Sequence, residues 1–320
     1  MSAEAVVHGR EAPITEEERP LIEQFRVDVA PVVSEFADSH VAQRVAADDF
    51  LVVRFLRARG LDVPKAIEMF KNMLVWRKEF DTDNALTWKF DKWDQVHELY
   101  PHYYFGFDKH GRPLYIDAPG KLNVSALLEL LDMDTMLKLH VAEAEYLNRV
   151  MKIESQKRNG LPTVQTATIV DLDGFAISKL NSQVREFLRR ISAVDQDNYP
   201  ESMGKMFIIN APWVFKAAWK VIRPWLHERT RAKIEIVGSD YKKAVCQEFG
   251  AENLPAFLGG DLPPTSHVEA AKFCQHEERM KRLLTTEATF EEILAEVLPA
   301  SECGSSATAV ESTASAAAGD

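Results

Sequence analysis

The sequence has few cysteines, and those it has are far apart. Cys246, Cys274 and Cys303 form no closely spaced pair. Neither a disulfide framework nor a cysteine-based metal site is therefore expected, and we predict three free thiols.

Long apolar runs and excess positive charge are also missing. No stretch approaches the roughly 18 apolar residues that a membrane span needs, and the N-terminus lacks the basic start and apolar run of a secretory signal. The 38 Lys and Arg are outnumbered by 49 Asp and Glu, which gives a formal charge of -11. This balance argues against a nucleic-acid-binding protein, whose affinity comes from neutralising phosphates. We predict a cytoplasmic protein.

Common catalytic motifs are absent as well. The sequence contains no P-loop, no GxGxxG, no GxSxG and no HExxH. Its nine histidines include none at a helical metal-pair spacing with a carboxylate between them. We interpret them as structural, and we predict no metal and no other cofactor.

One segment, TIVDLDGF at residues 168–175, does carry an enzyme-like pattern. An apolar strand that ends in Asp171 and Asp173 resembles the nucleophile motif of haloacid-dehalogenase phosphatases. Against this interpretation, Phe175 stands where that motif has Thr or Val, and no later strand ends in the acid pair that completes a metal site. The alternative is a structural strand whose terminal Asp171 caps the following turn. These residues alone leave both interpretations open.

Helical signals dominate the first hundred residues. Thr15, followed by three acidic residues, is typical of a helix start. Residues 46–59 show apolar spacing that predicts a helix ending at Gly60, and the next helix is expected after Asp62.

From about residue 100, strands alternate with helices. Residues 103–107 and 113–117 flank a DKHGR turn and predict a hairpin. The alternation that follows predicts an α/β fold with a mostly parallel sheet. We expect further strands at residues 166–172, 206–210 and 233–237, and helices at residues 132–158, 180–194, 241–249, 268–284 and 290–298. Residues 301–320 are small and polar, which predicts a disordered tail.

A basic segment, residues 216–233, carries a local charge of +5 inside this acidic chain. Three of the six tryptophans, Trp213, Trp219 and Trp225, lie in or beside it. Cations mixed with tryptophan suit a membrane interface. A core helix with a solvated basic edge would show the same pattern, so both interpretations remain open.

The strand at residues 166–172 places Thr166 and Thr168 on one face. Together with Tyr103, Tyr104 and Tyr115 on the expected hairpin, these hydroxyls suggest a face that lines something amphipathic. Plain strand propensity of threonine and tyrosine is the alternative.

Several blocks together resemble the CRAL-TRIO family in order and spacing, over about residues 48–263. They are FLRARGLDVPKAIEMFKNMLVWRKEF, YPHYYFGFDKHGRPLYI, TATIVDLDGF, NYPESMGKMFIINAPWVFKAAWKVIRPWL, TRAKIEIVG and AENLPAFLGG. Within this family, the blocks are most similar to those of the branch of secretory-pathway phosphatidylinositol/phosphatidylcholine transfer proteins. The resemblance implies that the DLDG block is a structural strand end. It also implies a hydrophobic lipid pocket with a sheet as its floor and a helical gate at about residues 213–233.

The resemblance also implies a division of the chain. A helical N-terminal region would occupy residues 1–98, ordered from about residue 20, and the CRAL-TRIO lipid-binding domain residues 99–265. C-terminal helices would follow at residues 266–300, before the tail.

Two headgroup sites are implied by the same resemblance. The choline-phosphate site would use Tyr104, Tyr115, Thr166 and Thr168, because tyrosine faces attract a quaternary ammonium. The gate and membrane contact would use Trp213, Phe215, Lys216, Trp219, Lys220 and Trp225, with Trp219 and the two lysines on the outer side. The inositol-phosphate site would use Arg59, Glu201, Thr230 and Lys233, which offer cations to a phosphodiester and an acceptor to inositol hydroxyls.

The sequence departs from the family pattern at two positions. Gly60 stands where the prototype has a lysine, and Ser202 replaces a basic residue. Both changes predict weaker affinity for inositol lipids.

The expected function is exchange of phosphatidylinositol and phosphatidylcholine between cytosolic membrane surfaces, without enzymatic chemistry. The expected partners are these phospholipids, a transient Golgi or endosomal membrane surface and a phosphatidylinositol kinase, and the protein is expected to be a monomer. A CRAL-TRIO carrier of a sterol, tocopherol or retinoid-like ligand is the alternative.

Overall fold

The computed structural model describes residues 12–159 and 165–298. The predicted tail and Cys303 lie outside these residues, whereas Cys246 and Cys274 are free thiols, as predicted. Within the described ranges, no helix is both long and apolar enough to cross a bilayer.

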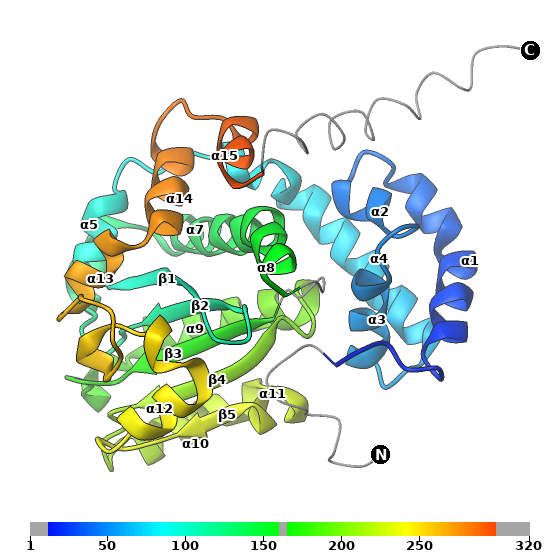
Figure 1. Cartoon of the computed structure of the whole chain (residues 1–320). Helices are drawn as coiled ribbons and strands as arrows, with labels where there is room; N and C mark the ends of the chain where they lie inside the picture. The colour runs from blue at the N-terminus through cyan, green and yellow to red at the C-terminus, as the bar shows by residue number, and fades with distance from the viewer. Residues whose placement is uncertain (1–11, 160–164, 299–320) are drawn as a thin grey trace, which may run out of the picture.

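The N-terminal helices pack around an aromatic centre. The ring of Phe70 meets Phe25 and Phe55 edge-on, at centroid distances of 5.7 and 5.0 Å, an arrangement that favours aromatic pairs beyond simple burial. Figure 1 shows these helices grouped beside the rest of the molecule. They are α1 (Arg19–Glu35), α2 (His40–Arg44), α3 (Asp49–Ala58) and α4 (Val63–Glu79).

The turn between α3 and α4 forms as the sequence predicts. Gly60 has a φ of 63°, and the amide of Leu61 donates to the carbonyl of Leu56 at 2.8 Å, which is the Schellman pattern of a helix C-terminus. The side chain of Asp62 then accepts from the amide of Lys65 and caps α4.

A mixed five-stranded sheet forms the centre of the remaining chain. The strands are β1 (His102–Phe107), β2 (Pro113–Asp117), β3 (Thr166–Asp171), β4 (Met203–Ile209) and β5 (Ile234–Ile236), in the order β1-β2-β3-β4-β5. Only the β1–β2 hairpin is antiparallel; the three other pairs are parallel. The predicted α/β fold with a mostly parallel sheet is therefore confirmed.

Helices and short turns connect and cover these strands (Figure 1). The short elements are η2 (Thr82–Thr87), η3 (Leu147–Met151), η4 (Ile177–Lys179), η5 (Arg223–Trp225), η6 (Ala251–Asn253) and η7 (Ala256–Leu258). The helices are α5 (Trp93–Leu99), α6 (Val124–Leu130), α7 (Met133–Tyr146), α8 (Lys152–Asn159), α9 (Ser182–Asn198), α10 (Phe215–Ile222), α11 (Glu228–Ala232), α12 (Lys242–Phe249), α13 (His267–Phe273), α14 (Gln275–Thr285) and α15 (Phe290–Val297).

The two faces of the sheet are covered differently. On one face, Ile116, Ile169 and Phe207 pack against Phe249 of α12 and Ala270 of α13 in a dense core. On the other, α7 and α14 cover β1, whereas α9 and α10 pack over β3, β4 and β5. This second face carries the cavity described below.

The helical stretch expected over residues 132–158 is confirmed, and it contains a π-helical turn, η3, between α7 and α8. The structure corrects another predicted helix. The helix expected over residues 268–284 is divided at Cys274, whose extended backbone separates α13 from α14. Apolar periodicity does not reveal this division, because apolar residues continue across it.

Candidate functional site

A cavity of about 540 Å³ lies between the second sheet face and helices α6, α9 and α10. Its floor is apolar because alternate residues of the strands point to the same side. Val170 of β3, Met206 and Ile208 of β4, and Ile234 of β5 line it. Phe187, Leu188 and Ile191 of α9, and Phe215, Trp219 and Ile222 of α10, also line it.

Four polar side chains predicted as one site lie in the cavity wall. They are Arg59, Glu201, Thr230 and Lys233. Arg59 comes from the end of α3, Glu201 precedes β4, Thr230 lies on α11, and Lys233 lies between α11 and β5. Three separate segments of the chain thus contribute to this wall.

Glu201 is the centre of this group. Its side chain is 9% exposed, and its two oxygens accept from Lys233 Nζ at 2.9 Å and Arg229 Nε at 2.7 Å. Burial raises the pKa of Glu201, but Lys233 and Arg229 outweigh burial and hold it below its usual value. The carboxylate is therefore ionised at neutral pH.

The backbone of Glu201 has a φ of 56°, a left-handed conformation that costs a non-glycine residue roughly 1–2 kcal/mol. Such strain often marks a functional position, since packing alone would select glycine or asparagine there.

Arg59 differs from the other cation of the group. Its guanidinium donates to the carbonyl of Ala58 at 3.3 Å, and among the described residues it forms no ion pair with a carboxylate. Lys233, in contrast, bonds Glu201 and the carbonyl of Met203. Arg59 thus keeps donors available for an anion in the cavity.

The four residues predicted for choline occupy the same sheet face. Tyr104 pairs with Tyr115, Tyr115 with Thr168, and Thr168 with Met206, so these residues form one row that leads to the cavity floor. None of the four, Thr166 included, is among the residues that line the cavity. Tyr104 and Thr168 are buried at 5% and 6% exposure, and the two tyrosine rings lie 5.0 Å apart. Their role in binding choline stays a prediction.

The basic segment has an outer and an inner side. Trp213 is 83% exposed, and Lys216 and Lys220 of α10 are also exposed. Phe215 is buried, however, and Trp219 lines the cavity. The expected outward position of Trp219 is wrong, because the sequence did not determine the rotation of α10 about its axis.

Trp225, the third tryptophan of the segment, is partly exposed, and its carbonyl accepts from Gln196 of α9. This contact fastens the end of the segment to the helix on the opposite wall.

Asp171 is a structural residue. Its carboxylate contacts His267 Nε2 at 3.0 Å, Asn210 Nδ2 at 2.8 Å and the backbone amide of Asp173 at 2.9 Å. The side chain is buried, and all of these contacts hold it in place. This arrangement supports the turn-capping interpretation, because both oxygens of Asp171 accept hydrogen bonds from the surrounding fold.

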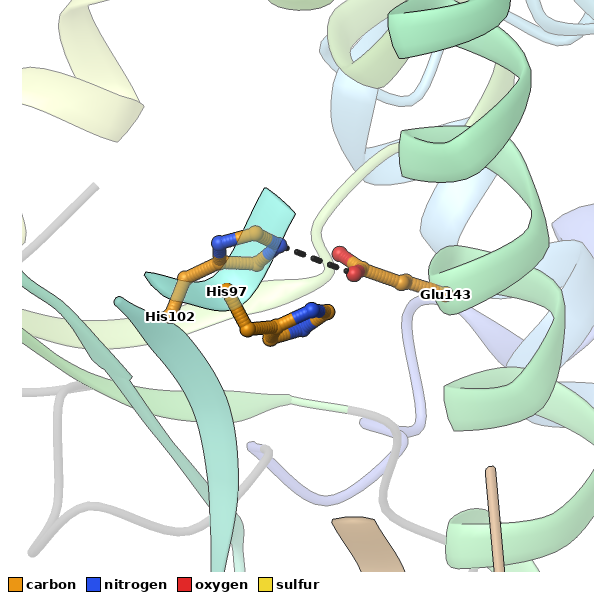
Figure 2. A group of neighbouring side chains, drawn as sticks. All are labelled: His97, His102 and Glu143. Atoms are coloured by element: carbon orange, nitrogen blue, oxygen red, sulfur yellow. Dashed lines mark hydrogen bonds and ion pairs between the residues drawn. The ribbon is translucent and has the colours of Figure 1, made fainter. Parts of the chain in front are cut away.

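Several polar residues that the fold brings together were not predicted as site residues from the sequence. Tyr100 and Asp117 line the cavity, and burial raises the pKa of Asp117 to about 6. Figure 2 shows a further group, His97 of α5, His102 of β1 and Glu143 of α7. His102 Nε2 lies 3.0 Å from Glu143 Oε1. Burial lowers the pKa of His102, but Glu143 outweighs burial and raises it to about 9. Each of these residues is unremarkable in the sequence, and only the fold brings them together.

Comparison with known families gives two matches. The family model described as "CRAL/TRIO domain" matches residues 97–260, and the one described as "CRAL/TRIO, N-terminal domain" matches residues 37–72. The first match spans the sheet and the cavity.

Curated relatives point the same way. The chain is 39% identical over 217 residues to the Sec14 cytosolic factor of Schizosaccharomyces pombe. This alignment covers 67% of this chain and 75% of that protein. The chain is also 37% identical over 214 residues to the Arabidopsis thaliana phosphatidylinositol/phosphatidylcholine transfer protein SFH7. This alignment covers 67% of this chain but only 39% of that longer protein. The crystal structure of Sfh5 superposes with a TM-score of 0.61 at 13% identity, over 80% of this chain and 91% of that one. This last match supports the fold alone.

Proposed function

Because the chain belongs to the CRAL/TRIO family, we propose that it carries single phospholipids between membrane surfaces, exchanging phosphatidylinositol and phosphatidylcholine. The observation that carries this proposal is the position of Arg59, Glu201, Thr230 and Lys233 along the wall of an otherwise largely apolar cavity. The relatives named as phosphatidylinositol/phosphatidylcholine transfer proteins support the same choice of ligand.

An apolar cavity removes the main barrier to lipid transfer. Each buried methylene is worth roughly 0.8 kcal/mol, so exposing two acyl chains to water costs on the order of 20 kcal/mol. Phe187, Leu188 and Ile191 offer the chains surroundings like those of the bilayer interior. The protein then acts by binding and release, and no covalent step is part of the proposal.

The polar group suits an inositol phosphate. Arg59 can donate to the phosphodiester without first breaking an ion pair, whereas Glu201 can accept from inositol hydroxyls. Thr230 adds a hydroxyl that can donate or accept. Choline has no hydroxyl that would need Glu201, so the two headgroups should depend on different residues. The row formed by Tyr104, Tyr115 and Thr168 is the proposed choline side.

The membrane contact is proposed for the outer side of the basic segment. Trp213, Lys216 and Lys220 are exposed together, and they combine an interfacial ring with two cations. The net charge of -11 repels an anionic surface, but salt screens that repulsion beyond about 8 Å, so local cations can act at contact. Phe215 and Trp219 on the inner side would follow when α10 moves to admit a lipid.

We extend the proposal to the cellular role. A monomer in the cytoplasm would visit Golgi or endosomal membranes and present phosphatidylinositol to a kinase that makes phosphoinositides.

A vesicle transfer assay tests the proposal. Full-length protein should move labelled phosphatidylinositol and phosphatidylcholine between vesicles, above a heat-inactivated control. The double variant Glu201→Ala/Lys233→Ala should lose inositol-lipid transfer and keep choline-lipid transfer. Lys205→Ala/Glu235→Ala is a matched control, because that ion pair on β4 and β5 has a similar length, 3.0 Å, but does not line the cavity. Transfer of neither lipid, or co-purification of a sterol or retinoid-like molecule instead of phospholipid, would overturn the proposal.

A further inference from the structure

We propose that His97, His102, Glu143 and Glu277 form a binding site for a single zinc ion, at a place separate from the lipid cavity. The first three residues offer ligand atoms that all lie within 4.8 Å of one another. They come from α5, β1 and α7, and Glu277 joins them from α14. None of the four lines the cavity.

The ring orientations are the first argument. Nδ1 of His97 lies 2.8 Å from the carbonyl of Trp93, and Nδ1 of His102 lies 2.8 Å from the carbonyl of Tyr100. A carbonyl only accepts, so each Nδ1 must carry a hydrogen. Both Nε2 atoms are thereby left as the ligand atoms, and Figure 2 shows both rings directed towards Glu143. Metal-binding histidines are commonly fixed in this way, by an Nδ1–H bond to a backbone carbonyl.

Unpaired polar atoms are the second, independent argument. Within residues 12–159 and 165–298, neither His97 Nε2 nor Glu277 Oε1 has a hydrogen-bond partner, although both are buried. The two atoms lie 3.4 Å apart, and the side chain of Glu277 is 7% exposed. Buried polar atoms without partners are uncommon because desolvation costs are not recovered, so each one calls for an explanation. An ion between them would satisfy both atoms.

Two of the distances fit zinc, whereas Glu277 lies outside the group of three residues within 4.8 Å and has to move closer to His102 and Glu143. Zinc bonds of about 2.0–2.2 Å in a tetrahedron place neighbouring ligand atoms about 3.4 Å apart. His97 Nε2 and Glu277 Oε1 already have this spacing, and His102 Nε2 lies 3.0 Å from Glu143 Oε1.

The remaining adjustment concerns the two rings, which stack at 22° with centroids 4.5 Å apart. One ion can lie in both ring planes only after a ring turns about its Cβ–Cγ bond, and that rotation weakens the Nδ1–H bond and the stacking of the ring that turns. Coordination also replaces the proton that His102 shares with Glu143.

The ligand set selects the metal. Two imidazoles and two carboxylates suit zinc, whereas magnesium and calcium prefer oxygen ligands alone. The side chain of His97 is 13% exposed, but its Nε2 is buried, so entry of an ion requires a local opening beside this residue. A bound ion would join α14, which follows the matched CRAL/TRIO segment, to the sheet and to α7.

Zinc binding by the full-length protein tests the proposal. After treatment with a chelator and its removal, zinc is titrated calorimetrically, and the bound metal is counted by mass spectrometry. We expect one zinc per chain, no competition from magnesium, and a higher melting temperature with zinc. His97→Gln should weaken binding at least about tenfold, since even residues that only support a metal ligand are worth 10- to 100-fold. The same variant loses the Nδ1–H bond to the carbonyl of Trp93 and the stacking of the ring on Trp93, so its melting temperature without zinc is measured beside its zinc affinity.

Two further variants complete the test. Glu277→Gln should also weaken zinc binding at least about tenfold, which gives a second result if His97→Gln unfolds. His276→Gln is the matched control, since His276 is also buried on α14 and pairs with Glu154 at 3.0 Å, outside the proposed site. It should keep wild-type zinc affinity. Absence of stoichiometric binding, or equal affinity in His97→Gln, Glu277→Gln and His276→Gln, would overturn the proposal. Lipid transfer is not a readout here, so this outcome is independent of the transfer activity.

Discussion

Replacement of Glu201 by asparagine separates its role in ligand binding from its role in stability. Asparagine removes the carboxylate, yet it tolerates the left-handed backbone that Glu201 adopts at a φ of 56°. The same substitution therefore relaxes the backbone and deletes the acceptor that we assign to inositol hydroxyls.

The expected change in stability is small. The Arg229 side chain is 52% exposed, so its ion pair with Glu201 contributes no more than about 1 kcal/mol. The bond to Lys233, whose side chain is 19% exposed, contributes about 1–3 kcal/mol, and Lys233 keeps its bond to the carbonyl of Met203. Relief of the left-handed strain returns about 1–2 kcal/mol. The free energy of unfolding should thus fall by no more than about 3 kcal/mol.

Transfer of phosphatidylinositol by Glu201→Asn should fall strongly. One charge-assisted hydrogen bond to the headgroup is worth about 1.5–3 kcal/mol, which corresponds to roughly a 10- to 150-fold loss of affinity for phosphatidylinositol. Phosphatidylcholine transfer should stay near the wild-type rate.

Vesicle transfer of the two labelled lipids, measured beside urea unfolding of the same preparation, gives both quantities. Wild-type phosphatidylinositol transfer in Glu201→Asn would refute the assignment of Glu201 to the headgroup. An equal fall in both activities, with unfolding unchanged, would show that the residue acts on the cavity as a whole.

Three further predictions concern the cavity wall, the cation missing beside Arg59 and the acid sensitivity of the N-terminal helices. Trp219→Ala should lower the amount of phospholipid that co-purifies, as measured by lipid mass spectrometry, because the ring lines the cavity; an unchanged lipid content would contradict this position. Gly60→Lys should raise phosphatidylinositol transfer, because it adds a cation at a position where a Cβ meets nothing within 4 Å. It should lower the free energy of unfolding, measured in urea, by about 1–2 kcal/mol, because φ at this position is 63°. Unchanged transfer would show that a cation at this position does not reach the ligand. Burial raises the pKa of Asp48, but Lys152 and Arg44 outweigh burial and hold this pKa well below its ordinary value of 3.8. Ionised Asp48 therefore stabilises the fold above about pH 4, and this contribution is lost as the pH falls further. Asp48→Asn, which keeps a helix-capping side chain, should therefore be less stable at pH 7 and lose less stability below pH 4 than the wild type; parallel stability curves would refute this.

Much of the fold could be predicted from the sequence because local interactions determine it. Gly60 and Asp62 form the predicted turn because a left-handed glycine and a capping carboxylate act within a few residues of chain. The hairpin and the strand at Thr166–Asp171 followed from apolar alternation between turn residues. The π-helical turn η3 and the division at Cys274 were not predicted, because they change the backbone without changing which residues are apolar.

The candidate site also has features that the sequence predicts and features that only the tertiary structure decides. By itself the sequence determined residue types and approximate elements, and its resemblance to a family named Arg59, Glu201, Thr230 and Lys233 before any geometry was known. It could not determine which side of α10 carries Trp219, since a rotation of the helix leaves the sequence pattern unchanged. Only contacts between distant segments decided that.

Asp171 and the histidines show the same limit most clearly. Asp171 is structural because His267, ninety-six positions later in the chain, bonds its carboxylate. His97, His102, Glu143 and Glu277 have no common spacing in the sequence, and they meet because packing of α5, α7 and α14 against β1 brings them together. Periodicity and caps act over a few residues and can be read along the chain, whereas the surroundings of a buried polar group are set by tertiary packing.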